Sequence, residues 1–187
     1  GWSIRRKSTH FEAYEEVAKR FAKMLGMDPW LINPLFERCG DVNFADGTGM
    51  DCLRTHTESL LNRIKRTYKD YGINEKPFVV GKADNGTYGM GIMTVRDVAD
   101  LDALNRKARN KMNVIKDGQT VNDVIIQEGV LTHEHINATV AEPVVYMLDR
   151  YVVGGFYRVH ADRGVDENLN APGASFVPLA FEQGAQL

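Results

Sequence analysis

Residues 77–95 read Pro-Phe-Val-Val-Gly-Lys-Ala-Asp-Asn-Gly-Thr-Tyr-Gly-Met-Gly-Ile-Met-Thr-Val, and this stretch decides the expected fold. Its two ends, residues 78–80 and 92–95, are short β-type runs, which predict two strands joined by a glycine-rich turn. Glycine in such a turn packs nothing and costs backbone entropy, so three of them indicate a hairpin whose N–H groups can approach an anion closely. A plain hairpin turn with a bulge explains them equally well. The glycines are Gly86, Gly89 and Gly91.

The part of the chain before this stretch is expected to be helical. Apolar residues recur every three or four positions over residues 9–25, where Thr9 and Glu12 suggest a capping box. A second amphipathic helix is expected from about residue 51 to 71, and residues 28–49 are expected to form a loop with one short helix. The expected apolar faces comprise Phe11, Tyr14, Val17, Ala18, Phe21, Met24 and Leu25 in the first helix and Leu53, Leu60, Leu61, Ile64 and Tyr68 in the second.

The rest of the chain is expected to be mainly β. Helices followed by a β-rich half are typical of the α+β fold class. We therefore expect two parts, a mainly helical one over residues 1–76 and a β-rich one over residues 77–187. The further elements of the second part are a helix at 97–112, a strand at 121–130, and a hairpin of strands 140–148 and 151–159 that turns at Asp149-Arg150.

The composition excludes several classes of protein. The 187 residues carry 23 Lys+Arg against 25 Asp+Glu, a net charge of −2, which gives no general attraction to nucleic acid or to an anionic membrane. No apolar run approaches the length of a membrane span. We therefore expect neither a nucleic-acid nor a membrane partner, and the sequence leaves the oligomeric state unknown.

The two cysteines, Cys39 and Cys52, are too few for a disulfide framework and do not have the spacing of a metal site. We therefore expect a reducing, cytoplasmic location. Neither cysteine is expected to have a histidine partner for nucleophilic catalysis. His133 and His135 are expected to be polar surface residues, because no third zinc ligand is evident near them.

Polar residues at strand ends can bind an anionic ligand. Lys82 ends a strand directly before the glycine-rich segment, where a long cation reaches phosphate oxygens; an edge-strand lysine that discourages aggregation is the alternative. Arg158 ends the last long strand, and a guanidinium fixed on a strand is a good phosphate clamp, although a surface arginine fits the spacing as well. Gln127 and Glu128 end another strand, where they can contact an adenine edge or simply form a polar strand end.

Residues 166–170, Asp-Glu-Asn-Leu-Asn, supply carboxylate and amide oxygens before a turn. Mg²⁺ binds oxygen ligands and usually takes one or two protein side chains together with nucleotide phosphates. The alternative is a polar turn, because Asn and Asp are common turn formers.

The order of these features resembles the ATP-grasp superfamily, in which two α+β subdomains clamp ATP. Longer motifs over nearly the whole chain are similar to the proteobacterial ATP-grasp type of glutamate–cysteine ligase. Members of that family are considerably longer, so we expect this chain to be the ATP-clamping part alone. Gly81 departs from the family pattern, since a β-branched residue is expected before the lysine and a glycine there would loosen the strand. The motifs lie at residues 1–11, 28–34, 82–96, 141–147, 152–160, 166–173 and 176–181.

The resemblance implies an ATP-dependent ligase that joins the γ-carboxyl of glutamate to the amine of cysteine through an acyl phosphate, the first step of glutathione synthesis. ATP and Mg²⁺ would be its cofactors, and glutamate and cysteine its small-molecule partners. An ATP-grasp peptide ligase with another amine acceptor and a non-catalytic ATP-binding fragment remain the alternatives.

The resemblance also implies roles for single residues. Lys82 and Arg158 would be the catalytic pair that holds phosphates, and Glu167 and Asn170 would bind Mg²⁺, with Glu142 in reserve. A basic segment at residues 5–7 could meet a substrate carboxylate or the nucleotide, or could be a solvated helix start. The remaining implied nucleotide contacts are Gly86, Thr87, Tyr88, Gly89 and Gly91 in the loop, Gln127, Glu128 and Val130 at the adenine, and Asn168.

Overall fold

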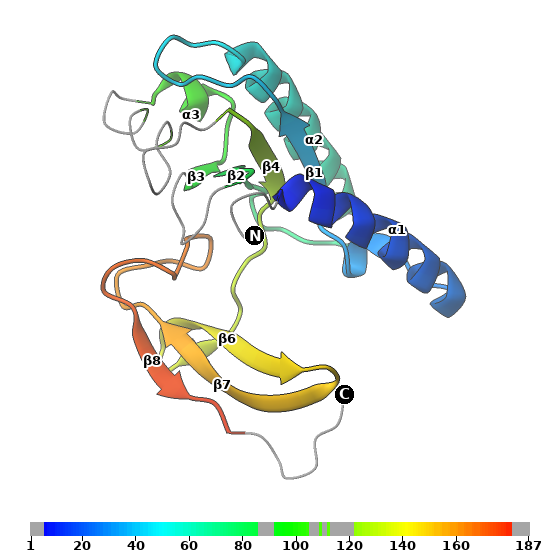
Figure 1. Ribbon diagram of the computed structural model, residues 1–187, viewed down its shortest axis with the longest axis vertical. Coiled ribbons are helices and arrows are strands. Elements are labelled where there is room, and N and C mark those ends of the chain that lie inside the picture. Colours follow the sequence, from blue (N-terminus) through cyan, green and yellow to red (C-terminus); the bar gives the residue numbers. More distant parts are fainter. Residues whose placement is uncertain (1–5, 86–91, 105–108, 110–111, 113–121, 181–187) are drawn as a thin grey trace. The chain divides into compact units, whose positions relative to one another are not determined.

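The computed structural model describes residues 6–85, 92–104, 109, 112 and 122–180. The chain forms two compact units, residues 1–129 and 130–187, and each contains an antiparallel sheet (Figure 1). The predicted α+β class is confirmed. The predicted division between residues 76 and 77 lies where the sequence pattern changes from helical to β-type. In the structure this position lies inside the first unit. In the described part of the chain, no helix combines the length and the apolar character needed to cross a membrane.

The first unit is built on a sheet with the strand order β1-β4-β2-β3. β2 pairs antiparallel with both β3 and β4, and the predicted strands at 78–80, 92–95 and 121–130 are confirmed. β1 corrects the prediction of a loop over residues 28–49, because its short run of Phe-Glu-Arg-Cys shows no apolar alternation and gains its pairing only from β4. The strands are β1 (Phe36–Cys39), β2 (Val79–Ala83), β3 (Ile92–Val95) and β4 (Val124–Glu128).

Helix α2 (Met50–Asp70) covers one face of this sheet and supplies much of the core (Figure 1). It begins after Gly49, whose φ of 74° lies in the left-handed region that favours glycine. Each apolar side chain buried here contributes about 2 kcal/mol to folding. The predicted apolar face is confirmed, since the buried residues of the helix are Met50, Leu53, Thr57, Leu60, Leu61, Ile64 and Tyr68.

Helix α1 (Lys7–Leu25) begins two residues earlier than the predicted capping box, and that capping box is wrong. The N-cap residue is Arg6, whose side chain makes no capping bond. Instead, the backbone N–H and the hydroxyl of Ser8 each donate a 2.7 Å hydrogen bond to the carboxylate of Asp84 at the end of β2. A side chain 76 positions away therefore satisfies the first turn of the helix, which no local pattern can reveal.

The predicted apolar face of α1 is largely uncovered. Ser8, Ala18 and Ala22 are its buried residues, and the helix packs on η2 (Pro29–Leu31), the predicted short helix. The exposed apolar residues of α1 are Tyr14, Val17, Phe21, Met24 and Leu25.

The predicted helix at 97–112 is broken in the structure. Helix α3 (Ala99–Asp102) is one turn long and is followed by a turn at Ala103. Arg109 and Met112 are again helical, and the residues around them lie outside the described part.

The second unit is a sheet with the strand order β5-β6-β7-β8. The predicted hairpin is confirmed as β6 and β7, and Asp149 at its turn has a φ of 55°, taking the left-handed position that glycine usually fills. The strands are β5 (His135–Ile136), β6 (Thr139–Leu148), β7 (Tyr151–Val159) and β8 (Ser175–Pro178). Among its described residues, the buried ones are Val140, Ala141, Val159, His160 and Leu169.

Candidate functional site

Lys82 and Gln127 come together on the sheet of the first unit. The ammonium of Lys82 donates a 2.9 Å hydrogen bond to Oε1 of Gln127 across the pairing of β2 with β4. Because side chains alternate along a strand, both point away from the face that α2 covers, where Val79 and Ala83 are buried. Burial lowers the pKa of Lys82 below its ordinary value. A half-buried cation therefore lies near the end of β2, four residues before Gly86 in the sequence.

Lys7, the last residue of the predicted basic segment, lies close to Lys82. Its ammonium donates a 2.6 Å hydrogen bond to the carbonyl of Ala83. Burial lowers the pKa of Lys7, the charge of Asp84 acts in the opposite direction, and the charge of Lys82 lowers it further. An anion that approached this end of β2 would meet two cations whose charge is already costly to maintain, so binding would relieve both.

The side chain of the residue opposite Gly81 on β3 occupies the space beside this glycine. Met93 lies opposite Gly81 in the strand register, and a Cβ at Gly81 would come within 2.6 Å of Cε of Met93. The Met93 side chain thus fills the space that a β-branched residue would need. β2 remains paired on both sides at this position, so the glycine does not interrupt the strand that carries Lys82.

Glu128 points to the opposite face of the sheet from Gln127. Its carboxylate accepts hydrogen bonds of 2.9 Å and 3.0 Å from Nε1 of Trp30 and one of 2.9 Å from the N–H of Leu35. Burial raises the pKa of Glu128, although these hydrogen bonds act against the shift. The side chain fastens η2 to the sheet and is directed away from Lys82.

In the second unit, Arg158 pairs with Glu142 across β6 and β7. The Arg158 side chain is only 20% exposed, and its Nε lies buried without a hydrogen-bond partner among the described residues. A buried guanidinium N–H without a partner is costly, which makes an acceptor from a ligand favourable there. Glu142, the reserve metal ligand of the sequence analysis, is engaged with this arginine.

The loop after β7 carries the oxygen ligands expected for Mg²⁺. The carboxylate of Glu167 accepts from the N–H of Gly164 at 2.8 Å and from Arg163 at 2.9 Å, and these two contacts lower its pKa, the Gly164 bond most. Asn168 accepts from the N–H of Asn170 at 3.0 Å, forming an Asx turn. An anionic carboxylate and exposed amide oxygens on one loop fit the preference of Mg²⁺ for oxygen.

His160 organises this loop, although the sequence patterns assign it no role. The ring is buried, its Nε2 lies 3.0 Å from the carbonyl of Pro172, and its Nδ1 accepts from the N–H of Asp162 at 3.3 Å. Gly173, with φ of 99°, passes over the ring so closely that a Cβ would lie 3.3 Å from Nε2. A histidine directly after an apolar strand is the available signal, because the partners are backbone groups that no side-chain pattern marks.

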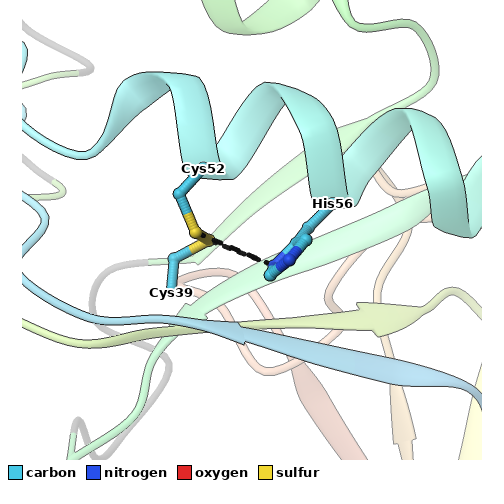
Figure 2. A group of neighbouring side chains, drawn as sticks. All are labelled: Cys39, Cys52 and His56. Atoms are coloured by element: carbon cyan, nitrogen blue, oxygen red, sulfur yellow. Dashed lines mark hydrogen bonds between the residues drawn. A yellow bond between two sulfur atoms is a disulfide. The ribbon is translucent and has the colours of Figure 1, made fainter.

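The two cysteines form a disulfide between the end of β1 and the start of α2 (Figure 2). Nδ1 of His56 lies 3.5 Å from Sγ of Cys39 and 3.8 Å from Sγ of Cys52. From the sequence, two cysteines are too few for a disulfide framework and neither is expected to have a histidine partner for catalysis, whereas the structure joins them in one disulfide and places His56 beside it. The three residues form no known motif in the sequence. The packing of α2 on β1 brings Cys39 close to Cys52 and His56.

The GshA family model, described as glutamate-cysteine ligase, matches residues 1–187. The chain belongs to this family. No curated protein gives a significant match to the chain.

A solved structure supports the membership in the glutamate-cysteine ligase family. It is the 1.90 Å crystal structure of a protein from Methylobacillus flagellatus KT that is provisionally assigned as a gamma-glutamylcysteine synthetase. The two chains are 56% identical and match with a TM-score of 0.84 over 97% of this chain and 43% of that chain. The present chain thus spans less than half the length of that relative.

For this glutamate-cysteine ligase family member, the structure sorts the expected site residues by unit. Lys82 and Gln127 are in contact in the first unit, and Glu128 points away from them. Val130 begins the second unit and is 70% exposed. Arg158 and the loop with Glu167, Asn168 and Asn170 also belong to the second unit. The expected loop contacts Gly86, Thr87, Tyr88, Gly89 and Gly91 lie outside the described residues.

Proposed function

We propose that this chain is the ATP-binding part of a ligase that joins the γ-carboxyl of glutamate to the amine of cysteine, and that its fold is of the ATP-grasp type. The observation that carries the proposal is the half-buried Lys82–Gln127 pair at the end of β2, in a chain of the glutamate-cysteine ligase family. A biosynthetic ligase that consumes ATP and amino acids is expected in the cytoplasm.

The proposed reaction has two steps. An oxygen of the glutamate γ-carboxylate attacks the γ-phosphorus of ATP, the bond to the β-phosphate oxygen breaks, and an acyl phosphate and ADP result. The cysteine amine then attacks the acyl carbon, phosphate leaves with the bonding electrons, and the amine loses a proton. Phosphoryl transfer of this kind depends mainly on positioning and on neutralising charge.

The first unit would supply the phosphate and adenine contacts. Lys82, with Lys7 beside it, would hold phosphate oxygens, and the glycine-rich residues that follow β2 in the sequence would supply further phosphate contacts. Gln127 would orient Lys82 and contact the adenine, and Val130 is a further candidate for an adenine contact. Glu128 would contribute only through its main chain, because Trp30 and Leu35 occupy its carboxylate.

The family resemblance assigns further phosphate and metal contacts to residues of the second unit. The Nε of Arg158, which has no hydrogen-bond partner among the described residues, would donate to a phosphate oxygen, while Glu142 holds the other end of the guanidinium. Glu167 and Asn170 would hold Mg²⁺ and Asn168 would contact phosphate or metal. When bound, Mg²⁺ would neutralise charge on the phosphates.

Titration calorimetry with ATP and Mg²⁺ tests the phosphate role of Lys82. We expect Lys82→Ala to weaken binding by about tenfold to a hundredfold, the value of a hydrogen bond to a charged group, and to leave the circular dichroism spectrum unchanged. Lys65→Ala removes an exposed lysine from α2 and should bind ATP as the wild type does. Wild-type affinity in Lys82→Ala would remove the assignment.

ADP release measured with glutamate and each candidate amine tests the reaction, in the protein as naturally encoded. Cysteine should stimulate release, and Lys82→Ala should abolish it. Stimulation by another amine alone would indicate a peptide ligase. ATP binding without any turnover would indicate a non-catalytic nucleotide-binding protein.

A further inference from the structure

Cys39, Cys52 and His56 form a cluster that the proposed ligase reaction does not use. Cys39 is the last residue of β1, and Cys52 and His56 lie one helical turn apart on the same face of α2 (Figure 2). Their two sulfur atoms and the imidazole nitrogen all lie within 4.8 Å of one another. The cluster sits on the side of the sheet that α2 covers, so it is separate from Lys82 and Gln127 on the other face.

The distances from the histidine to the two sulfurs are those of a zinc site. With Zn–S of about 2.3 Å, Zn–N of about 2.0 Å and tetrahedral angles, a nitrogen and a sulfur ligand lie about 3.5 Å apart. Nδ1 of His56 lies 3.5 Å and 3.8 Å from the two sulfurs. The histidine is therefore already placed for a metal held by both cysteines, and only the sulfur–sulfur bond stands in the way.

The surroundings also suit a thiolate-bound metal. Cys39 is buried, whereas Cys52 and His56 are half-buried, so a cation and a water molecule can enter from one side. Cys52 lies in the first turn of α2, where the positive end of the helix dipole stabilises a thiolate. Two thiolates with an imidazole favour zinc over the hard cations, which prefer oxygen.

We propose that Cys39, Cys52 and His56 form a metal site of the reduced protein that takes Zn²⁺, with the disulfide as its oxidised, metal-free form. A dithiol reductant breaks the disulfide, supplies two electrons and two protons, and becomes a disulfide itself. Zn²⁺ then displaces one proton from each thiol and gains Nδ1 of His56 as third ligand, and water completes the fourth position. Either state ties the end of β1 to the start of α2.

Zinc titration of the reduced and the oxidised protein, in competition with a chromophoric chelator, tests the site. A phosphine serves as reductant because it competes little for the metal. We expect one Zn²⁺ per reduced chain and none per oxidised chain. Loss of an outer partner alone costs a metal site about tenfold in affinity, so Cys52→Ser and His56→Ala should each lose at least that much. His135→Ala removes an exposed histidine of the second unit and should bind zinc unchanged.

Co²⁺ gives an independent readout that a purely structural disulfide would not produce. Near-ultraviolet thiolate-to-cobalt bands should arise in the reduced wild type and in His135→Ala, and should weaken strongly in Cys52→Ser. Circular dichroism checks folding, and if Cys52→Ser does not fold, His56→Ala decides. Absence of zinc binding by the reduced wild type, equal binding by the oxidised protein, or full affinity in His56→Ala would each overturn the proposal. None of these outcomes bears on ATP binding.

Discussion

Helices α1 and α2 are similar in length and in apolar periodicity, yet they are used differently. α2 buries its whole apolar face on the sheet of the first unit. α1 buries Ala18 and Ala22, while Val17 and Met24 on the neighbouring side are 63% and 82% exposed. The period of a helix shows where its apolar stripe lies. How much of that stripe is covered depends on the surface the helix meets, and η2 is much narrower than a four-stranded sheet.

The largest expected effect is on the covered helix. Leu60→Ala in α2 removes a side chain with no exposed surface and should cost about 3 kcal/mol in the free energy of unfolding, because the core cannot close around the cavity. Urea denaturation measures the loss.

The matched control is the same substitution on α1. Leu25 is 59% exposed, so Leu25→Ala should cost about 0.5 kcal/mol or less. If Leu25→Ala lowered the free energy of unfolding as much as Leu60→Ala does, the apolar stripe of α1 would be covered in solution, and the two helices would not differ in burial.

A smaller effect is expected where α1 is fastened to the sheet. Ser8→Ala removes a buried hydrogen bond to the carboxylate of Asp84 and should cost about 2 kcal/mol, since a charged acceptor loses a donor inside the protein. Thr9→Ala, at the exposed position that the sequence suggests as the cap, should cause no loss. If thermal denaturation showed a larger loss of stability for Thr9→Ala than for Ser8→Ala, the capping box predicted from the sequence would be correct after all.

The smallest effect concerns Glu128, which holds η2 between the two helices. Trp30 of η2 donates to Glu128 and its ring lies 4.9 Å from that of Tyr71, next to the end of α2. Burial raises the pKa of Glu128 above 4.5, so the folded state binds this proton more readily than the unfolded state does. The resulting stabilisation is fully present below pH 4.5 and is lost as the pH rises through the raised pKa.

Glu128→Gln should therefore flatten the dependence of stability on pH in that window. Denaturation midpoints measured at several pH values give the profile. Glu58→Gln, at an exposed position of α2, should keep the wild-type profile. If the stability of wild type and of Glu128→Gln changed with pH in the same way, the carboxyl of Glu128 would have the same pKa in the folded and the unfolded protein. The attachment of η2 would then not depend on a buried carboxyl group.

Several features of the fold follow from short-range patterns. The strands around residues 77–95, the β6–β7 hairpin and helix α2 all show the period of their element, because side-chain burial repeats with the backbone geometry. β1 shows no such period, since an edge strand of four residues is stabilised by its neighbour rather than by its own composition. The break after α3 and the Asp84 contact of α1 are likewise invisible locally.

For the candidate site, the sequence identified the residue types and their order, and the structure decided which side chains can act together. Adjacent positions such as Gln127 and Glu128 look equivalent as a polar strand end, but alternation sends one to Lys82 and the other to Trp30. The roles of His160 and His56 are not visible in the sequence, because His160 contacts backbone atoms and His56 contacts a cysteine on another element.

Composition, periodicity and long motifs were enough to indicate the α+β class, the family and the principal strands and helices. The covering of α2 but not of α1, the contact of Asp84 with a helix start 76 positions away, and the convergence of two cysteines with a histidine became visible only in the folded chain. One cause explains all three. The burial of a side chain and its contacts depend on which elements pack against each other. Local sequence determines the apolar and polar faces of each element, but it does not determine which other element covers them.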